Sequence, residues 1–336
     1  MTPASPFPPL AVLGAGSWGT ALATQLARRN QAVTLWGRNA ADLHDITTVR
    51  QNRRYLPGIE LPDGVRTDGD LPRVVASHPE LLVCVPSHAF RSTLVAIRPH
   101  LAAGTRVAWA TKGFEHATGR LPHEVAAEEL GDGVPVAVLS GPTFAREVAA
   151  GLPTAMTVAS GDPAYASALA TRLSDQAFRA YTSDDMIGVE VGGAVKNVLA
   201  IGAGISDGLG FGANTRIALI TRGLVEMTRL GVALGARATT FMGLSGMGDL
   251  VLTCTDDQSR NRRFGLAIAR GASAADAARV IGQVVEGRFA ASAVRAVAGR
   301  LGLEMPICEQ VYRVLEEGLA PQAAVLALMA RALKPE

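Results

Sequence analysis

Cysteine is scarce in this sequence, and its three residues stand far apart. Cys84, Cys254 and Cys308 form no Cys-x-x-Cys pair, which argues against both a disulfide framework and a thiolate zinc site. Cys84 lies in the apolar run 81–85, where a buried cysteine acts as a small hydrophobe. We therefore expect reduced thiols and a cytoplasmic location.

An excess of one charge is also absent. The chain carries 32 basic and 30 acidic residues, for a net charge of +2, which argues against a protein that coats nucleic acid but leaves room for a local anion pocket. Apolar runs are interrupted before they reach the roughly 18–20 residues of a membrane span. The first ten residues contain four prolines and no basic residue, unlike a secretory signal. We expect a soluble chain without stable membrane insertion, beginning with a flexible tail at 1–9.

The first half of the chain alternates short apolar runs with helical stretches. The runs occupy 10–13, 32–36, 81–85, 106–110, 136–139 and 155–159. This alternation is typical of βαβ units and a mostly parallel sheet, and the continuous apolarity of the runs fits strands covered on both faces. The sequence predicts an α/β protein whose N-terminal domain, residues 10–187, is a doubly wound Rossmann-type sheet.

The pattern changes after about residue 186, where helical periodicity replaces the strand-like runs. The expected helices span 186–205, 214–234, 261–270, 274–281, 288–301 and 309–317. A chain of 336 residues is long enough for two domains, and we expect a C-terminal all-α domain at 188–336. The sequence leaves the oligomeric state open; a homodimer through this alanine-rich domain is one expectation.

A Gly-x-Gly-x-x-Gly turn follows the first predicted strand and opens a helix. Gly14 permits the tight turn, Gly16 lets a pyrophosphate approach the backbone, and Gly19 lets the helix pack closely on the strand. The helix N-terminus then offers free N–H groups to the phosphates. Because both flanks are correct, dinucleotide binding is favoured over an ordinary strand–helix connection.

The second predicted strand ends at Trp36, and Arg38 follows it. A site selective for NAD would carry Asp or Glu there to hold the ribose hydroxyls. A guanidinium suits the 2′-phosphate of NADP instead, although a solvated surface arginine is the alternative. We expect NADP or NAD to bind, with NADPH favoured.

Two further turns in the first domain carry polar groups that core packing does not explain. Lys112 comes directly after a predicted strand, at the edge where parallel sheets bind ligands, and could also be a surface lysine. Gly141 and Thr143 belong to the segment 140–145, which follows another strand and exposes N–H groups and a hydroxyl. A simple strand-ending turn is the alternative there.

The second domain holds two more such segments. Lys196 and Asn197 interrupt an otherwise apolar helix rich in small residues, and desolvation would lower the lysine pKa and make it a proton donor near neutral pH. Three glycines precede Asp249, which suggests close backbone approach. The segment 259–261, Ser-Arg-Asn, lies where a helix begins and suits a phosphate, while Ser259 could equally be an N-cap.

Taken together, these segments resemble the bacterial type of NAD(P)-dependent glycerol-3-phosphate dehydrogenases. The matching motifs occur in the family's order from about residue 10 to 290: 14–23, 85–87, 111–113, 140–145, 190–197, 248–250, 253–254, 259–261 and 285–287. The resemblance implies hydride transfer between sn-glycerol 3-phosphate and dihydroxyacetone phosphate, with no metal, in the direction that supplies phospholipid synthesis.

The resemblance also implies roles for single positions. Lys196 matches the family's general acid/base and contacts substrate. Positions that match substrate ligands are Lys112, Gly141, Thr143, Asp249, Ser259, Arg260 and Asn261. Positions that match cofactor contacts beside the glycine turn are Ser17, Trp18, Arg38, Lys112, Ala145, Arg260, Val284 and Glu286.

Two other functions remain open from the sequence. A 2-hydroxy-acid or ketopantoate-type reductase would share the fold and a catalytic lysine, but such enzymes take carboxylates, and the phosphate seat at 259–261 disfavours them. A non-catalytic NADPH-sensing regulator would keep the fold alone. Cofactor binding requires none of Lys196, Asn197 or Asp249, so their presence together disfavours a regulator.

Overall fold

The computed structural model describes residues 7–332 of the chain, which divide into two compact units. Unit 1 comprises the described part of Met1–Thr111 together with Pro122–Met186, and unit 2 comprises Lys112–Leu121 and the described part of Ile187–Glu336. Most of the tail expected at 1–9 lies outside the described residues.

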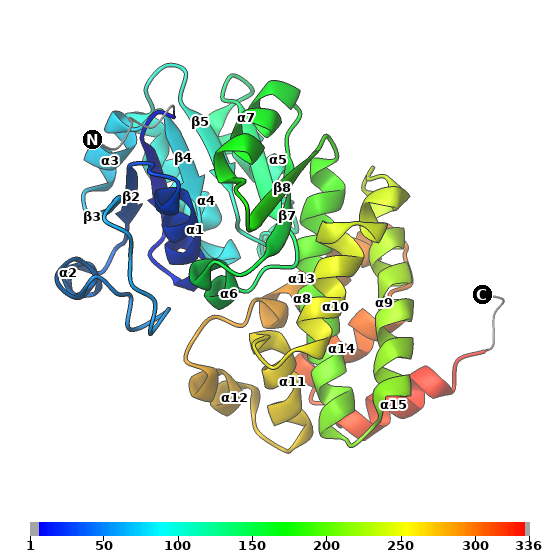
Figure 1. Ribbon diagram of the computed structural model, residues 1–336. Helices are drawn as coiled ribbons and strands as arrows, with labels where there is room; N and C mark the ends of the chain where they lie inside the picture. Colours follow the sequence, from blue (N-terminus) through cyan, green and yellow to red (C-terminus); the bar gives the residue numbers. More distant parts are fainter. Residues whose placement is uncertain (1–6, 333–336) are drawn as a thin grey trace. The chain divides into compact units, whose positions relative to one another are not determined.

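Unit 1 is built on one sheet of eight strands in the order β3-β2-β1-β4-β5-β6-β7-β8 (Figure 1). All neighbouring strands are parallel except β6 and β7. The strands are β1 (Leu10–Leu13), β2 (Val33–Trp36), β3 (Val65–Asp68), β4 (Glu80–Val83), β5 (Arg106–Trp109), β6 (Val136–Ser140), β7 (Thr154–Ala159) and β8 (Phe178–Ser183). The predicted doubly wound, mostly parallel sheet is confirmed.

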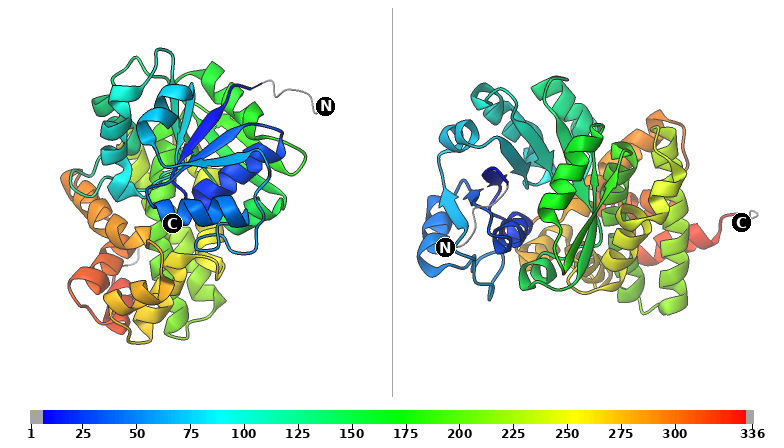
Figure 2. Two further views of the ribbon diagram at one scale, coloured as in Figure 1. Left: turned by 90° about the vertical axis from the view of Figure 1, so that its left-hand side faces the viewer. Right: turned by 45° about the horizontal axis from the view of Figure 1, so that its top comes forward.

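Helices flank this sheet, as Figure 2 shows for the blue-to-green part of the chain. They are α1 (Ser17–Arg28), α2 (Ala40–Val49), α3 (Leu71–Ser77), α4 (Ser87–Ile97), α5 (Pro122–Leu130), α6 (Ala145–Ala150) and α7 (Pro163–Leu173), with a 3₁₀ turn at Arg98–His100. Every residue of β1 and β4 is buried, which explains why these strands read as continuous apolar runs.

Two strands were not predicted, and both lie at the edges of the sheet. β3 buries only Val65, and β8 buries only Phe178. An edge strand that faces solvent needs little apolar surface, so neither segment shows the apolar run that marked the central strands.

Among its described residues unit 2 contains helices and loops but no strand, as predicted. Its helices are α8 (Met186–Gly208), α9 (Ala213–Ala233), α10 (Asp249–Thr255), α11 (Arg260–Ala269), α12 (Ala274–Ile281), α13 (Glu286–Arg300), α14 (Pro306–Glu316) and α15 (Pro321–Met329), with a 3₁₀ turn at Ala238–Met242 and a π-helical turn at Leu244–Gly248. The sequence did not predict α10, which is a short helix behind a glycine-rich segment, or α15, whose apolar residues show no amphipathic period.

Helix α8 is the core helix of unit 2, buried from Gly188 to Ser206. Its length and composition would also suit a membrane span, but 89% of its apolar window is buried, as expected of a core helix that is apolar all round. The small residues serve close packing. A Cβ on Gly192 would lie 2.3 Å from the Ser245 carbonyl oxygen, and one on Gly204 would lie 2.0 Å from the Arg262 carbonyl oxygen. Helix α11 and the glycine-rich turn therefore pack directly on the backbone of α8.

The segment Lys112–Leu121 differs from the expected division into 10–187 and 188–336, because it belongs to unit 2. Phe114 and Leu121 are part of the helical core. Arg300 of α13 donates to the Thr118 carbonyl oxygen at 2.9 Å. Burial of two apolar side chains and a hydrogen bond from the Arg300 side chain thus hold this segment among the helices.

Candidate active site

Three charged side chains from distant parts of the sequence meet in unit 2. The Lys112 ammonium donates to Oδ2 of Asp249 at 2.7 Å, and the Lys196 ammonium donates to Oδ1 of the same carboxylate. Lys196 also donates to the Thr253 hydroxyl at 3.1 Å, and that hydroxyl donates to the Asp249 carbonyl oxygen at 2.6 Å. One buried carboxylate therefore holds two ammonium groups, and the alternative of a free surface lysine at 112 is wrong.

Burial and the neighbouring charges set the protonation states of Lys196 and Asp249. Desolvation lowers the pKa of Lys196 to about 7; the Asp249 charge opposes this shift, while the Lys112 charge adds to it. Burial alone would raise the pKa of Asp249, but the two lysines outweigh it and the pKa is lowered. Asp249 therefore remains ionised, and Lys196 is poised to gain or lose a proton near neutrality.

Beside the lysine, two asparagine side chains link three helices. Asn197 donates to the Gly193 carbonyl oxygen at 3.1 Å and accepts from the Asn261 amide at 2.8 Å. Asn261 in turn accepts from the Gly287 N–H at 2.9 Å. A Cβ on Gly287 would lie 2.5 Å from the Asn197 carbonyl oxygen. Asn261 is thus oriented by α8 and α13, with one amide hydrogen left for another partner.

The segment 259–261 begins a helix, as expected. Ser259 caps α11 by accepting from the Arg262 N–H at 3.2 Å. Arg260 donates to Gln283 Oε1 at 3.2 Å. Burial lowers the Arg260 pKa, while the nearby Glu286 carboxylate raises it. The helix start therefore combines a guanidinium with the positive end of a helix dipole, which suits a phosphate.

The remaining cofactor positions predicted in unit 2 lie close to this helix start. Val284 follows Gln283, and Glu286 is the first residue of α13. Both lie near Arg260, because Gln283, which accepts the Arg260 hydrogen bond, belongs to the loop between α12 and α13. Their contact with a cofactor stays a prediction.

The glycine turn in unit 1 has the predicted strand–turn–helix context. Gly14 has a φ of +126°, and a Cβ there would lie 2.6 Å from the Cys84 carbonyl oxygen. A Cβ on Gly19 would lie 2.0 Å from the Gly14 carbonyl oxygen, whereas one on Gly16 would meet nothing within 4 Å. The fold itself thus requires the first and third glycines, while the second faces open space.

The start of α1 offers donors at the same turn. No side chain caps this helix, whose N-cap is Gly16 and whose first residues are Ser17 and Trp18. The Trp18 indole N–H is buried without a hydrogen-bond partner among residues 7–332. A buried unpaired donor is costly, so both observations fit a bound dinucleotide.

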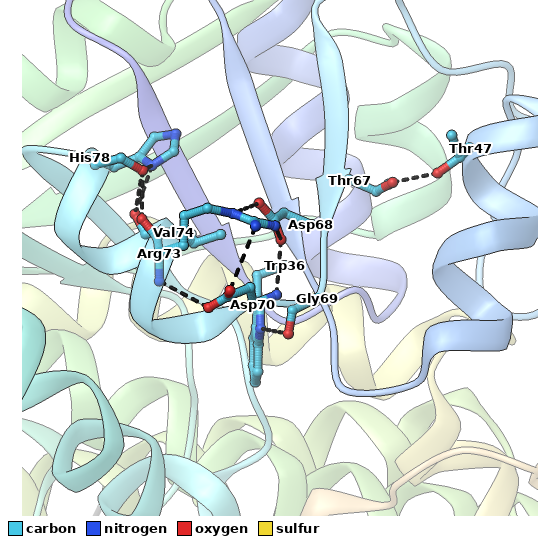
Figure 3. Close-up of polar contacts among 10 residues, drawn as sticks. Trp36, Thr47, Thr67, Asp68, Gly69, Asp70, Arg73, Val74 and His78 are labelled. Carbon is cyan, nitrogen blue, oxygen red and sulfur yellow. Dashed lines mark hydrogen bonds and ion pairs between the residues drawn. The ribbon is translucent and has the colours of Figure 1, made fainter.

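The end of β2 presents Arg38, which is exposed and makes no hydrogen bond or ion pair with any described residue. Strand β3 lies beside β2, with Trp36 in register with Asp68. Figure 3 shows that the segment after β3 is tied to β2 by the Trp36 indole, which donates to the Gly69 carbonyl oxygen at 3.2 Å.

Acidic side chains beside this strand end are paired with another arginine. Arg73 donates to both oxygens of Asp68, at 3.1 and 2.7 Å, and forms an ion pair with Asp70 at 3.6 Å (Figure 3). These carboxylates therefore form their ion pairs with Arg73 and not with the Arg38 guanidinium. That arrangement is compatible with a 2′-phosphate partner for Arg38.

Gly141, Thr143 and Ala145 follow β6 in unit 1. A Cβ on Gly141, whose φ is +152°, would lie 2.8 Å from the Met156 Cα of β7. The Thr143 hydroxyl donates to the Gly141 carbonyl oxygen at 3.2 Å, and Ala145 is the first residue of α6. Packing explains this glycine, and the ligand roles of the three residues stay predictions.

Sequence reasoning gave no role to two side chains that the structure places in the site. Thr253 stands four residues after Asp249 on α10, a spacing that puts both on one helix face. That spacing would have identified it had α10 been predicted. Gln283 carried no signal, because its partnership with Arg260 spans 23 residues and depends on the tertiary fold.

Comparison with known proteins identifies the family. The family model "NAD-dependent glycerol-3-phosphate dehydrogenase N-terminus" matches residues 9–166, and its C-terminal counterpart matches residues 185–326. The chain belongs to the NAD-dependent glycerol-3-phosphate dehydrogenase family. A glycerol-3-phosphate dehydrogenase [NAD(P)+] of Pseudoalteromonas translucida is 58% identical over 97% of each chain.

Solved structures agree with this assignment. A crystal structure of glycerol-3-phosphate dehydrogenase from Coxiella burnetii superposes with a TM-score of 0.94 at 49% identity, covering 96% of this chain and 99% of that one. A ketopantoate reductase from Ralstonia eutropha reaches a TM-score of 0.59 at 17% identity, over 94% and 99% of the two chains. The second likeness shows a shared fold and no more, so it does not support the ketopantoate alternative.

Proposed function

We propose that this chain interconverts dihydroxyacetone phosphate and sn-glycerol 3-phosphate by hydride transfer, with Lys196 as general acid/base. The observation that carries the proposal is the buried ion pair of Lys196 with Asp249. It combines a lysine pKa of about 7 with a carboxylate that stays ionised. A carbonyl reduction needs such a group, because an alkoxide develops on oxygen and must receive a proton.

The nicotinamide supplies and accepts the hydride when it is bound. Lys196 hydrogen-bonds the reacting oxygen and transfers a proton to it during reduction, or removes one during oxidation. Asp249 keeps the ammonium in place, and Thr253 holds it from a second side. Lys112 contributes another positive charge on the far oxygen of Asp249.

The start of α11 holds the substrate phosphate in this proposal. Arg260 can bind two phosphate oxygens at once, and the helix dipole and the remaining Asn261 hydrogen add to the attraction. Binding the phosphate far from the carbonyl helps to fix the reacting geometry. This selects a phosphorylated triose over a carboxylate substrate.

Unit 1 holds the dinucleotide through the glycine turn. The open space at Gly16 and the Trp18 indole N–H, which has no hydrogen-bond partner among residues 7–332, support a pyrophosphate there. Arg38 favours NADPH over NADH. We further propose that Lys112, Gly141 and Thr143 contact substrate, and that Ala145, Val284 and Glu286 contact the cofactor.

The same proposal includes a cellular setting. The enzyme works in the cytoplasm, chiefly towards glycerol 3-phosphate for phospholipid synthesis, as a homodimer formed through unit 2. Exposed apolar side chains on α9, namely Ile217, Val225 and Val232, support a partner on that helix. Light scattering should give twice the chain mass, and a monomer would overturn the dimer without affecting the reaction.

Steady-state reduction of dihydroxyacetone phosphate, with NADPH and NADH compared, tests the function. We expect turnover with both and a higher kcat/KM with NADPH. Lys196→Ala should abolish turnover while NADPH binding, followed by fluorescence, and the circular dichroism spectrum stay close to wild type. Near-normal turnover in this variant would overturn the lysine assignment, and an inactive wild-type enzyme would overturn the function.

A further inference from the structure

Arg262 is buried in the first turn of α11, two residues after Arg260, with 8% of its surface exposed. Its Nε and Nη2 donate to Oδ2 of Asp207 at 3.1 and 2.6 Å, and its Nη1 donates to Asp257. The Arg262 guanidinium is therefore paired with two carboxylates and is not a free cation.

The two carboxylates belong to different parts of unit 2. Asp207 is in the last turn of α8, the helix that carries Lys196. Asp257 lies in the loop between α10 and α11, just before the cap residue Ser259, and its side chain is 82% exposed. Arg262 thus ties the loop that leads into the proposed phosphate seat to the helix of the proposed acid/base.

Backbone packing holds the same turn from α8. A Cβ on Gly204 would lie 2.0 Å from the Arg262 carbonyl oxygen, so the two helices touch there without a side chain between them. Nearby, Asn197 of α8 accepts from Asn261. The start of α11 is therefore fixed on α8 by a backbone contact, an amide pair and an ion pair.

We propose that Arg262 is a positioning residue for the phosphate seat, which it orients relative to Lys196 without touching substrate. This inference rests on the proposed function, in which the start of α11 holds the phosphate. Arg262 orients the seat by fixing the direction of the helix start through its contacts with Asp207 and Asp257.

Arg216 supplies a matched control. This arginine of α9 donates to both oxygens of Asp207, at 3.0 and 2.9 Å. None of its hydrogen bonds or ion pairs among the described residues reaches α11. Arg216→Met therefore removes one partner of Asp207 while leaving the seat in place, whereas Arg262→Met removes the tie to the seat itself.

The experiment compares dihydroxyacetone phosphate with dihydroxyacetone, which lacks the phosphate and does not use the seat. For Arg262→Met, kcat/KM for the phosphorylated substrate should fall on the order of 10²-fold, as for a misplaced binding group. Its kcat/KM for dihydroxyacetone should stay within about twofold of wild type, because this substrate has no phosphate for the seat to position. Arg216→Met should leave both values near wild type, and Arg262→Lys should restore part of the loss.

Asp257→Asn keeps the test decisive if Arg262→Met does not fold, because its carboxylate is exposed and its loss leaves the core intact. It should lower kcat/KM for the phosphorylated substrate alone, by a smaller factor. Equal losses with both substrates, or equal effects of the Arg216 and Arg262 variants, would overturn the positioning role. A wild-type enzyme that fails to reduce dihydroxyacetone phosphate would instead overturn the proposed function.

Discussion

Lys196 and Asp249 lie 53 residues apart in the chain and form a buried ion pair in unit 2. Their side chains are 9% and 1% exposed, so water contributes little to the solvation of either charge. Each group therefore depends on the other for its charged form. This dependence makes the protonation of Lys196 sensitive to any change of charge beside it.

The first prediction concerns pH. The pKa of Lys196 is about 7, so the lysine is charged below pH 7 and neutral above it. Reduction consumes the lysine proton, so kcat/KM for dihydroxyacetone phosphate should fall above pH 7, by about tenfold for each pH unit. Oxidation of glycerol 3-phosphate needs the neutral amine, so its kcat/KM should rise up to about pH 7 and level off above it. Steady-state rates from pH 6 to 9 check both directions, and parallel profiles would contradict the assignment.

The second prediction uses charge changes on either side of Lys196. The Lys112 charge lowers the Lys196 pKa and the Asp249 charge raises it. Lys112→Met should therefore move the midpoint of the pH–kcat/KM profile to higher pH, and Asp249→Asn should move it to lower pH. Thr253→Val is the uncharged control: it removes one hydrogen-bond acceptor of the ammonium and should move the midpoint less than either charge change.

Asp249→Asn carries a second expectation for stability. It leaves Lys112 and Lys196 without their carboxylate, and at a pH low enough to keep both lysines charged, breaking the buried pair costs about 3–5 kcal/mol. Urea unfolding followed by circular dichroism measures this loss. In the pH profiles, midpoints that move in the same direction for the Lys112 and Asp249 variants would show that these charges do not set the pKa of Lys196.

The fold could be predicted where burial dictates the sequence. The central strands are covered on both faces and appear as apolar runs. The long helices of unit 2 appear as segments with helical periodicity. Edge strands such as Val65–Asp68 have only one buried residue, so they carry no comparable pattern. The sequence pattern places Lys112–Leu121 in the first domain, because nothing local in a sequence shows that a loop packs on distant helices.

The site could be predicted where a residue type is out of place in its segment. Lys196 in an apolar helix and Asp249 after three glycines have that property. Arg262 does not, because arginine is ordinary at the start of a polar helix, and only the fold shows its burial against Asp207. The glycines before Asp249 predict close backbone approach, and a Cβ on Gly246 would lie 2.2 Å from the Phe241 carbonyl oxygen.

The third prediction concerns cofactor choice. Arg38→Ala should raise the KM for NADPH on the order of tenfold or more, because a charge-assisted hydrogen bond contributes about 1.5–3 kcal/mol. The KM for NADH should change little, since NADH lacks the 2′-phosphate. Arg179→Ala, on the exposed face of the edge strand β8, is the control and should alter neither value. An equal loss with both cofactors would reject the 2′-phosphate role.

The fourth prediction separates two glycines of the dinucleotide turn. A Cβ on Gly19 would lie 2.0 Å from the Gly14 carbonyl oxygen, whereas a Cβ on Gly16 would meet no atom within 4 Å. Gly19→Ala should therefore lower Tm by several degrees, since about 1 kcal/mol shifts Tm by roughly 2–4 °C in proteins of 150–250 residues. Gly16→Ala should leave Tm of the cofactor-free protein unchanged and weaken NADPH, because the added methyl would stand where the pyrophosphate approaches. Thermal unfolding and fluorescence titration measure the two effects, and unchanged NADPH affinity in Gly16→Ala would place the pyrophosphate elsewhere.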